Sequence, residues 1–158
     1  MESAAIYEKL KSRFDDRAFE LKQTGGDAFV VINSPSIDRV AGYLKEDEEL
    51  WFDSLLCLSA VDEGENLAVV YHLFSMLHRH RFALKALVSS HNPTLPSVEH
   101  VWKAANWYER EAYDLMGIRF DGHPDLRRIL LPDDWPGHPL RKDYVFPDEY
   151  DGIPCMRE

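Results

Sequence analysis

The spacing of hydrophobic residues changes from helical to strand-like within the first thirty-odd positions. Ile6, Leu10 and Phe14 recur at every fourth position, which places them on one face of a helix. The stretches "AFELKQ" and "GGDAFVVIN" then have the character of two strands, joined by a turn at Gly25-Gly26. The chain is therefore expected to begin with a helix and a strand hairpin.

A second helical stripe follows Pro35. Proline suits the first turn of a helix, and Ser34 or Ser36 is expected to cap the free amides there. The apolar positions then repeat at helical spacing, at Ile37, Val40, Ala41 and Leu44. The acidic run 46–49 is interpreted as the solvated end of this helix or the loop after it.

The middle of the chain has strand patterns. The apolar stretch 51–62 predicts a strand, residues 62–66 a turn, and residues 67–77 a second strand that closes a hairpin. A third strand carries apolar residues at alternate positions, namely Phe82, Leu84, Ala86 and Val88. Because Pro93 and Pro96 interrupt the following stretch, residues 89–97 are expected to form a loop.

Helical spacing returns after this loop. Ser97 is the expected cap of a helix that buries Val98, Val101, Trp102 and Ala105. Asn106 and Glu109 stand three residues apart, and this capping-box pattern predicts a new helical turn. Gly117 is the expected residue just after the helix end.

This order of elements predicts an α+β fold with a single small domain. Residues 1–117 are expected to form the core, a mixed or antiparallel sheet covered by helices. Residues 118–158 hold most of the nine prolines and have no clean period. They are interpreted as an extended, Pro-rich C-terminal segment, called the arm below, that serves for docking.

Composition narrows the function classes. The 158 residues, 45% of them hydrophobic, are enough for one domain with a real core. A net charge of −10 argues against general affinity for nucleic acids or anionic membranes. The apolar runs are too short to span a bilayer, and the N-terminus lacks the pattern of a signal peptide. Any membrane association is therefore expected to be indirect, through partners.

The histidines and cysteines give only a weak metal hypothesis. The two cysteines form no CxxC motif, so the chain alone is not expected to hold an iron–sulfur cluster or a zinc ribbon. His78 and His80 would share one face of a strand, but without a nearby carboxylate or thiol. His123 and His138 would have to meet Cys155 in space, at a spacing that fits no zinc pattern. The preferred interpretation is that His123 and His138 each hydrogen-bond the backbone in a turn.

A catalytic interpretation rests on the "ERE" stretch. Glu109 and Glu111 flank Arg110, and a hydrolase or lyase could use such a cluster. On a helix, however, the two glutamates point about 200° apart and cannot share one site. Arg110 and Asp114 are spaced as an ordinary i, i+4 helix pair. No nucleophile elbow, phosphate loop or dinucleotide fingerprint is found.

Docking fits the arm better. Proline lowers the entropy that a segment loses when it is ordered on a partner. Aromatic residues supply anchors and arginines supply planar donors for carboxylates on a neighbour. The residues of these two kinds are Trp135, Tyr144, Phe146, Tyr150, Arg127, Arg128 and Arg141. The alternative, which stays open beside it, is that the arm wraps the core of its own domain.

The stretch "WYEREAYDLMGIRFDGHPDLRRILLPDDWPGHPLRKDY" closely resembles the signature region of the 30-kilodalton subunit family of NADH:quinone oxidoreductase, respiratory complex I. The pattern of this family has an "ERE" helix, an aromatic-Asp, a hydrophobic-Gly-Ile, then "HP-x-LRRIL-P-x-x-W" and "PLRKDY". The match is highly specific and covers Glu109, Arg110, Glu111, Asp114, Gly117, Ile118, Phe120, His123, Pro124, Leu126, Arg128, Ile129, Leu130, Pro132, Trp135, Pro139, Leu140, Arg141, Lys142, Asp143 and Tyr144.

The resemblance implies a non-catalytic subunit that helps assemble the quinone-reducing and iron–sulfur electron-transfer module. The implied partners are the quinone-site subunit and the subunit that holds the terminal iron–sulfur cluster, and no nucleic acid. No cofactor is implied in this chain, whereas flavin and iron–sulfur clusters are expected in partner subunits. The implied location is peripheral, on the cytoplasmic side of the cell (inner) membrane. The expected docking residues are Glu109, Arg110, Glu111, Asp114, His123, Arg127, Arg128, Trp135, His138, Arg141, Lys142, Asp143 and Tyr144.

Two alternatives stay open. One keeps the scaffold role in a related machine, a membrane-bound hydrogenase or a complex fed by ferredoxin or a deazaflavin. The other is a stand-alone metal-dependent hydrolase that would use His123, His138 and either Glu109 or Glu111. Since the sequence ends at Glu158, soon after the signature, we expect a separate chain and not a form fused to the quinone-site subunit.

Overall fold

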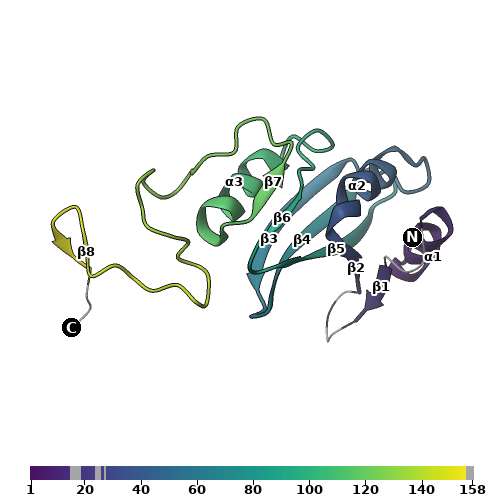
Figure 1. Ribbon diagram of the computed structural model, residues 1–158. Helices are drawn as coiled ribbons and strands as arrows, with labels where there is room; N and C mark the ends of the chain where they lie inside the picture. Colours follow the sequence, from purple (N-terminus) through teal and green to yellow (C-terminus); the bar gives the residue numbers. More distant parts are fainter. Residues whose placement is uncertain (15–18, 24–25, 27, 156–158) are drawn as a thin grey trace.

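The computed structural model describes residues 1–14, 19–23, 26 and 28–155 (Figure 1). The helices are α1 (Ser3–Arg13), the short 3-10 helix η2 (Ser34–Ser36), α2 (Ile37–Glu46) and α3 (Ala105–Met116). The strands are β1 (Phe19–Lys22), β2 (Phe29–Asn33), β3 (Ser54–Asp62), β4 (Asn66–Ser75), β5 (His80–Ser89), β6 (Thr94–Pro96), β7 (Arg119–Asp121), β8 (Glu149–Tyr150) and β9 (Ile153–Pro154). No helix within these ranges is both long and apolar enough to cross a membrane.

The central sheet has five strands in the order β1-β2-β5-β4-β3. Strand β2 runs parallel to β5, with Val30 opposite Leu84, while the other neighbours are antiparallel. The sheet is therefore mixed, and the predicted α+β fold is confirmed. The expected pairing of β1 with β2 is confirmed too, but Gly25 of the expected turn lies outside the described residues.

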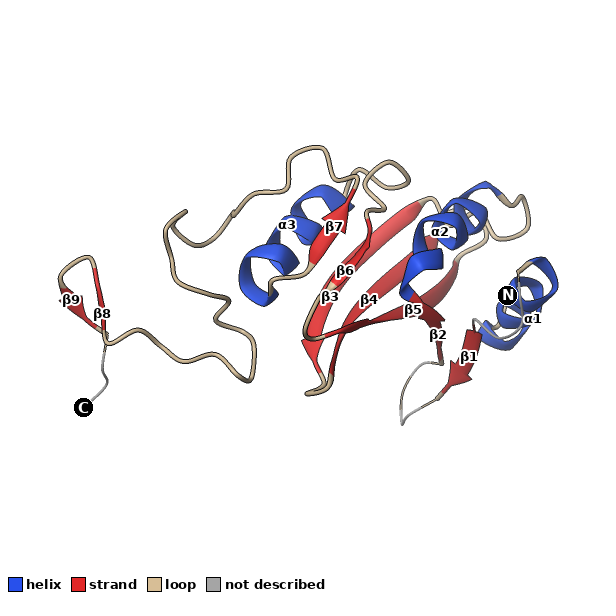
Figure 2. Ribbon diagram, in the orientation of Figure 1, coloured by secondary structure: helices blue, strands red, loops and turns tan. Residues whose placement is uncertain are grey.

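One apolar core joins the helices to one face of this sheet. Ile6 and Leu10 of α1 are fully buried. So is the whole stripe predicted for α2, Ile37, Val40, Ala41 and Leu44. These side chains belong to the same cluster as the alternating residues of β5, Phe82, Leu84, Ala86 and Val88. Figure 2 shows α2 and α3 beside the same face of the sheet. The helical spacing in α2 and the alternation in β5 therefore both identified the buried side correctly.

Two predictions between residues 89 and 104 are wrong. The expected loop contains β6, which pairs in parallel with β7 so that Leu95 lies opposite Phe120. The helix expected from Ser97 is a run of turns, and the α-helix begins only at Ala105. The apolar spacing still marked buried positions, because Val98, Val101, Trp102 and Ala105 all lie in the core.

Of the side-chain caps expected, only Ser97 accepts a following amide, that of Glu99 at 3.1 Å, and it does so at a run of turns and not at an α-helix. The residues at the N-caps of η2, α2 and α3 make no capping hydrogen bond through their side chains. Glu109 does not reach back to Asn106, because its carboxylate binds the Ser97 hydroxyl and the Val98 amide instead. The capping-box spacing therefore located the start of α3 but assigned the wrong partners.

The end of α3 agrees with the sequence. Gly117 takes a left-handed conformation with φ of 73°, and its N–H donates to the Tyr113 carbonyl at 2.9 Å. The core continues past this point, since Ile118 and Phe120 are 0% and 2% exposed. Residues 122–148 then contain no helix or strand, and the chain reaches the small β8–β9 hairpin, shown in yellow away from the sheet in Figure 1.

The buried face of the sheet gives a direct stability test. Leu84→Ala removes a fully buried side chain from the core, so we expect the free energy of unfolding to fall by about 2–5 kcal/mol. Leu56→Ala is the matched control, because Leu56 is 48% exposed on the same sheet, and its effect should stay within about 0.5 kcal/mol. Urea titrations of the two variants measure the difference. Similar losses would mean that both faces of the sheet are covered.

Candidate functional site

Helix α3 carries the polar residues of the signature and distributes them over different directions. Glu109, Arg110 and Asp114 are 0%, 8% and 0% exposed, whereas Glu111 is exposed. The separation expected from 100° per residue is therefore found, with Glu109 and Glu111 on different sides of the helix. Three of the four charged positions contact other parts of this chain and not solvent.

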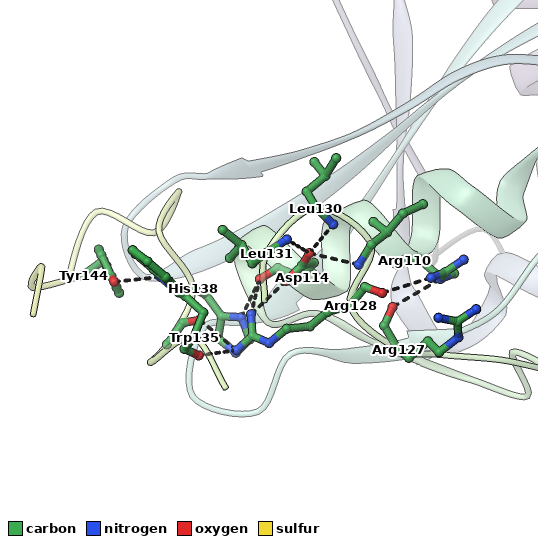
Figure 3. A network of polar contacts seen from close by, with 11 residues as sticks. Arg110, Asp114, Arg127, Arg128, Leu130, Leu131, Trp135, His138 and Tyr144 are labelled. Atoms are coloured by element: carbon green, nitrogen blue, oxygen red, sulfur yellow. Dashed lines mark hydrogen bonds and ion pairs between the residues drawn. The ribbon is translucent and has the colours of Figure 1, made fainter. Parts of the chain in front are cut away.

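The Asp114 carboxylate is the point at which the arm is fastened to α3. Its Oδ2 atom accepts hydrogen bonds from the amides of Ile129, Leu130 and Leu131 at 3.0, 2.8 and 2.9 Å. Its Oδ1 atom accepts from the Arg128 guanidinium at 2.7 Å. Figure 3 shows Arg128, Leu130 and Leu131 converging on this side chain. This arrangement, called the Asp114 cluster below, fixes four consecutive residues of the arm against one turn of the helix.

The environment of Asp114 determines its charge. Burial alone would raise the pKa of this carboxyl, but the Leu131 amide, the Arg128 guanidinium and the neighbouring amides together lower the pKa below its ordinary value of 3.8. The carboxylate is therefore ionised at neutral pH although it is fully buried. A buried charge of this kind is tolerated only where every acceptor site is paired, as here.

Arg128 extends the cluster toward the second half of the arm. The second amino group of its guanidinium donates to the carbonyls of Trp135 at 2.8 Å and Gly137 at 3.2 Å. Its side chain is only 16% exposed. One planar guanidinium thus binds the helix and two positions of the arm at the same time.

Arg110 forms a second fastening and corrects a prediction. Its guanidinium donates to the carbonyls of Arg127 at 3.2 Å and Arg128 at 2.9 Å (Figure 3). The i, i+4 pair expected between Arg110 and Asp114 is not formed, because Asp114 pairs with Arg128. Arg127 itself lies outward and pairs with the exposed Asp125.

The return of the arm past the end of α3 depends on His138. Its Nδ1–H donates to the carbonyl of Asp114 at 2.9 Å. The ring lies so close to Gly117 that a Cβ at that glycine would stand 2.6 Å from the His138 Cδ2 atom. Gly117 is thus required twice, for its left-handed backbone and for the space that the imidazole fills. The Leu140 amide donates to the Leu115 carbonyl just beyond.

The aromatic residues of the arm contact one another. The Trp135 indole N–H donates to the Tyr144 hydroxyl at 3.1 Å. The Trp135 ring also packs against Tyr150, with ring centroids 4.7 Å apart, and Phe146 packs edge-on against Tyr144 at 5.4 Å. These contacts hold residues 135–150 in one arrangement beyond the reach of the Asp114 cluster.

A further fastening joins the arm to the central sheet. The Arg141 guanidinium donates to the Ser90 carbonyl at the end of β5 and pairs with Asp143 at 2.9 Å. The Lys142 amide donates to the Asp62 carboxylate at 2.8 Å. This bond is the first cause of the lowered pKa of Asp62. The predicted residues Arg141, Lys142 and Asp143 therefore form a group separate from the Asp114 cluster.

His123 makes only local contacts. Its Nδ1 accepts from the Asp125 amide at 3.0 Å, so the proton lies on Nε2, which donates to the Asn106 carbonyl at 3.1 Å. Together with the His138 bond, this confirms that both imidazoles hydrogen-bond the backbone. Within the described residues, no three His, Cys, Asp or Glu side chains form a group that could hold a metal ion.

Glu109 is the second buried carboxyl of α3, and its environment is the opposite of that of Asp114. Burial raises its pKa to about 7, despite hydrogen bonds from the Ser97 hydroxyl at 2.6 Å and the Val98 amide at 2.8 Å, and nearby Glu99 raises it further. The hydroxyl of Tyr71 is also buried, without a hydrogen-bond partner among the described residues. Glu109 therefore binds the segment just after β6 to α3 and is fully buried.

Some large apolar residues around the arm remain at the surface. They are Trp107, Leu130, Leu140, Val145, Phe146 and Ile153, between 57% and 84% exposed. Trp107, which is not among the predicted docking residues, borders a hollow of about 660 Å³ with Tyr108, Ile129 and Leu130. The sequence does carry a signal for this exposure. On the helix, Trp107 lies about 200° from Ala105 and from Glu109, and so falls outside the buried stripe.

Two curated relatives are similar over most of this chain. A subunit of NADH-quinone oxidoreductase from Chloroherpeton thalassium is 45% identical over 132 residues, which are 82% of this chain and 55% of the relative. The identically named protein from Roseiflexus sp. is 42% identical over 138 residues, 85% of this chain and 79% of the relative. This chain thus spans about half the length of the first relative. The family model described as "Respiratory-chain NADH dehydrogenase, 30 Kd subunit" matches residues 30–150.

Two solved structures have a similar fold. A trypsin-resistant fragment of Nqo5 aligns with a TM-score of 0.60 and 29% identity, over 80% of this chain and 100% of that one. A chain of an archaeal respiratory membrane complex, the membrane-bound sulfane sulfur reductase, aligns with a TM-score of 0.72 over 90% of this chain and 85% of that one. The sequence identity in the second case is 23%, so this likeness concerns the fold alone.

The Asp114 cluster predicts local protection of the arm. Asp114→Asn cannot serve three amides and a guanidinium, because its amide group would place N–H donors against donors. We expect hydrogen exchange at the amides of Ile129, Leu130 and Leu131 to become at least about 10-fold faster, since each loses a charge-assisted bond. Asp125→Asn, at an exposed ion pair, should leave the three amides unchanged. Unchanged exchange in Asp114→Asn would show that other contacts hold the arm.

The pKa of Glu109 predicts an unusual pH dependence. Its folded pKa, about 7, is higher than the ordinary 4.5, so its contribution to stability is full below pH 4.5 and is lost as pH rises through 7. The loss is on the order of 3 kcal/mol. Glu109→Gln cannot ionise and should therefore gain stability relative to the unmodified chain between pH 5 and 8. Urea unfolding measures the stability of both proteins across this range, and the difference between them removes the contributions of all other titrating groups. A difference that does not change with pH would contradict the raised pKa of Glu109.

Proposed function

Because this chain belongs to the 30-kilodalton subunit family of respiratory-chain NADH dehydrogenase, we propose that it docks through its arm and helps assemble the quinone-reducing part of the enzyme. In this proposal the complex translocates protons, and the chain is a peripheral-arm subunit on the cytoplasmic side of the cell membrane. Catalysis is left to other subunits. The role of the chain is to hold a fixed surface against its neighbours.

One observation carries the proposal: the arm is held in place and yet presents apolar side chains. The Asp114 cluster and Arg110 fasten it to α3 through hydrogen bonds within this chain. Val145 and Phe146 nevertheless remain 84% and 57% exposed. A segment that is ordered before binding loses little further entropy, so apolar burial on a partner becomes net affinity. Exposed apolar groups on a fixed segment are typical of an interaction surface.

The proposed neighbours are the quinone-site subunit and the subunit that holds the terminal iron–sulfur cluster. The proposed division of labour leaves flavin and iron–sulfur clusters to partner subunits. The polar chemistry of this chain is consistent with such a division, because the signature carboxylates Asp114 and Glu109 are occupied by internal hydrogen bonds. Glu111 is the one signature carboxylate of α3 that is left exposed to a neighbour.

The hydrolase alternative has little support in the geometry. His123 and His138 both use a ring nitrogen to bind a backbone carbonyl, and Glu109 lies in the core. The scaffold role in a related membrane-bound complex is compatible with the same fold. The electron donor belongs to other subunits, so the docking proposal is the same for either machine.

Val145→Asp tests the docking role. Val145 is the most exposed large apolar residue in the described part of the arm, so this change should leave the melting temperature within about 1 °C of the unmodified value. We expect the other subunits that co-purify with the tagged chain from gently solubilised membranes to fall by about 10-fold or more, as quantified by mass spectrometry. Ser12→Asp adds the same charge at an exposed position of α1 and should change neither quantity. Full recovery with Val145→Asp would count against docking at this part of the arm.

A further inference from the structure

The central sheet has a second face, opposite the helices. Ala68 and Ala83 are buried by neighbouring strands, but they are absent from the apolar core that the helices share. Alternation along β4 and β5 therefore directs their neighbours at i±2 to the same outer side, among them Val70, Arg81 and Lys85. The described helices contribute their buried stripes to the other side.

The middle of this outer face is apolar and hollowed. Phe29 of β2, Val70 of β4 and Leu56 of β3 line a groove of about 1010 Å³. Leu56 lies where the register between β3 and β4 shifts, in a β-bulge, and is 48% exposed. Three apolar side chains from three strands thus form one patch and not scattered exposures. A patch of this kind is typical of an interaction surface.

The border of the groove is basic in an acidic chain. Arg79, Arg81 and Lys85 line it, whereas the whole chain has a net charge of −10. Lys85 pairs with Glu63 and lies 5.7 Å from the centre of the Phe29 ring. Arg79 and Arg81 are exposed and form no ion pair within the described part of the chain. Two guanidinium groups therefore stay available to carboxylates from outside.

We propose that this outer face binds an acidic, amphipathic segment of a neighbouring subunit. Its apolar stripe lies on Phe29, Val70 and Leu56, and its carboxylates pair with Arg79 and Arg81. A second copy of this chain does not fit, because a two-fold contact through this face would oppose like charges. An anionic bilayer does not fit either, because the remainder of the chain is strongly acidic.

This inference rests on the proposed function only in that it needs a multi-subunit complex. The groove lies on the face of the sheet away from α2 and α3, with Ser3 at the start of α1 on its border. The fastenings of the arm run instead along α3 and to the ends of β3 and β5. A protein with two separate docking surfaces can hold two neighbours in a fixed relation. The two surfaces can be disrupted separately, so their tests are independent.

A photo-crosslinking experiment tests the surface in the assembled complex. The tagged full chain carries p-benzoylphenylalanine in place of Leu56, which is exposed, and native membranes are illuminated before purification. We expect one dominant cross-linked peptide from another subunit, with an apolar stripe and at least two carboxylates. Cross-links to a second copy of this chain, to lipid, or to no molecule while the complex still co-purifies would overturn the inference alone. Recovery of the chain without other subunits would overturn the proposed function as well.

Charge reversal then tests the proposed pairing. Arg79→Glu with Arg81→Glu should lower the cross-link yield by at least about 10-fold, while the arm still retains the other subunits. Arg13→Glu, which reverses an exposed charge on α1, should leave the yield unchanged. Replacing the carboxylates of the cross-linked peptide by lysine should restore the yield with the double variant. An undiminished yield in the double variant, or no restoration by lysine, would refute the pairing; equal melting temperatures exclude misfolding as the cause.

Discussion

The buried carboxylate of Asp114 is the constraint on which the first half of the arm depends. Residues 122–148 have no helix or strand of their own, so their backbone groups need partners from elsewhere. Asp114 supplies acceptors for three consecutive amides, and Arg128 carries the connection onward to Trp135 and Gly137. One ionised carboxylate and one planar guanidinium thus take the place of the backbone hydrogen bonds that a helix or strand would form. An irregular segment can thereby pair its backbone groups without a neighbouring strand.

Asp114 and Glu109 lie five residues apart on one helix, and their surroundings shift the pKa values of their carboxyls in opposite directions. Asp114 meets a guanidinium and a row of amides, which outweigh the cost of burial. Glu109 meets one amide, one hydroxyl and another glutamate, which do not. Ionisation of Asp114, which faces the arm, is therefore favoured by the fold, whereas ionisation of Glu109, which is buried beside the core, is disfavoured. Residue type alone does not distinguish these cases, since the number and charge of the donors decide them.

The periodic parts of the fold could be predicted because their signal is local. The stripe from Ile37 to Leu44 and the alternation from Phe82 to Val88 each follow from a repeat that one face must bury. The capping box and the Arg110–Asp114 pair failed for the same reason. Spacing identifies which side chains can meet within a helix, but Glu109 and Asp114 found stronger donors 11 to 17 residues away. Short strands such as β6 were missed because three residues give no period.

The position of the signature residues changes what the family resemblance means for binding. Arg128 looked like a docking residue because it lies outside any apolar period, yet its side chain is 16% exposed and its donors serve this chain. Similarity at such positions therefore specifies how the arm is fastened. In the proposed docking, the choice of neighbour depends on groups that the internal contacts leave exposed, such as Val145, Phe146, and the arginines Arg79 and Arg81 at the start of β5. Those groups face solvent from segments that strand pairing or the contacts of the arm already hold, so specificity can change there without loss of the fold.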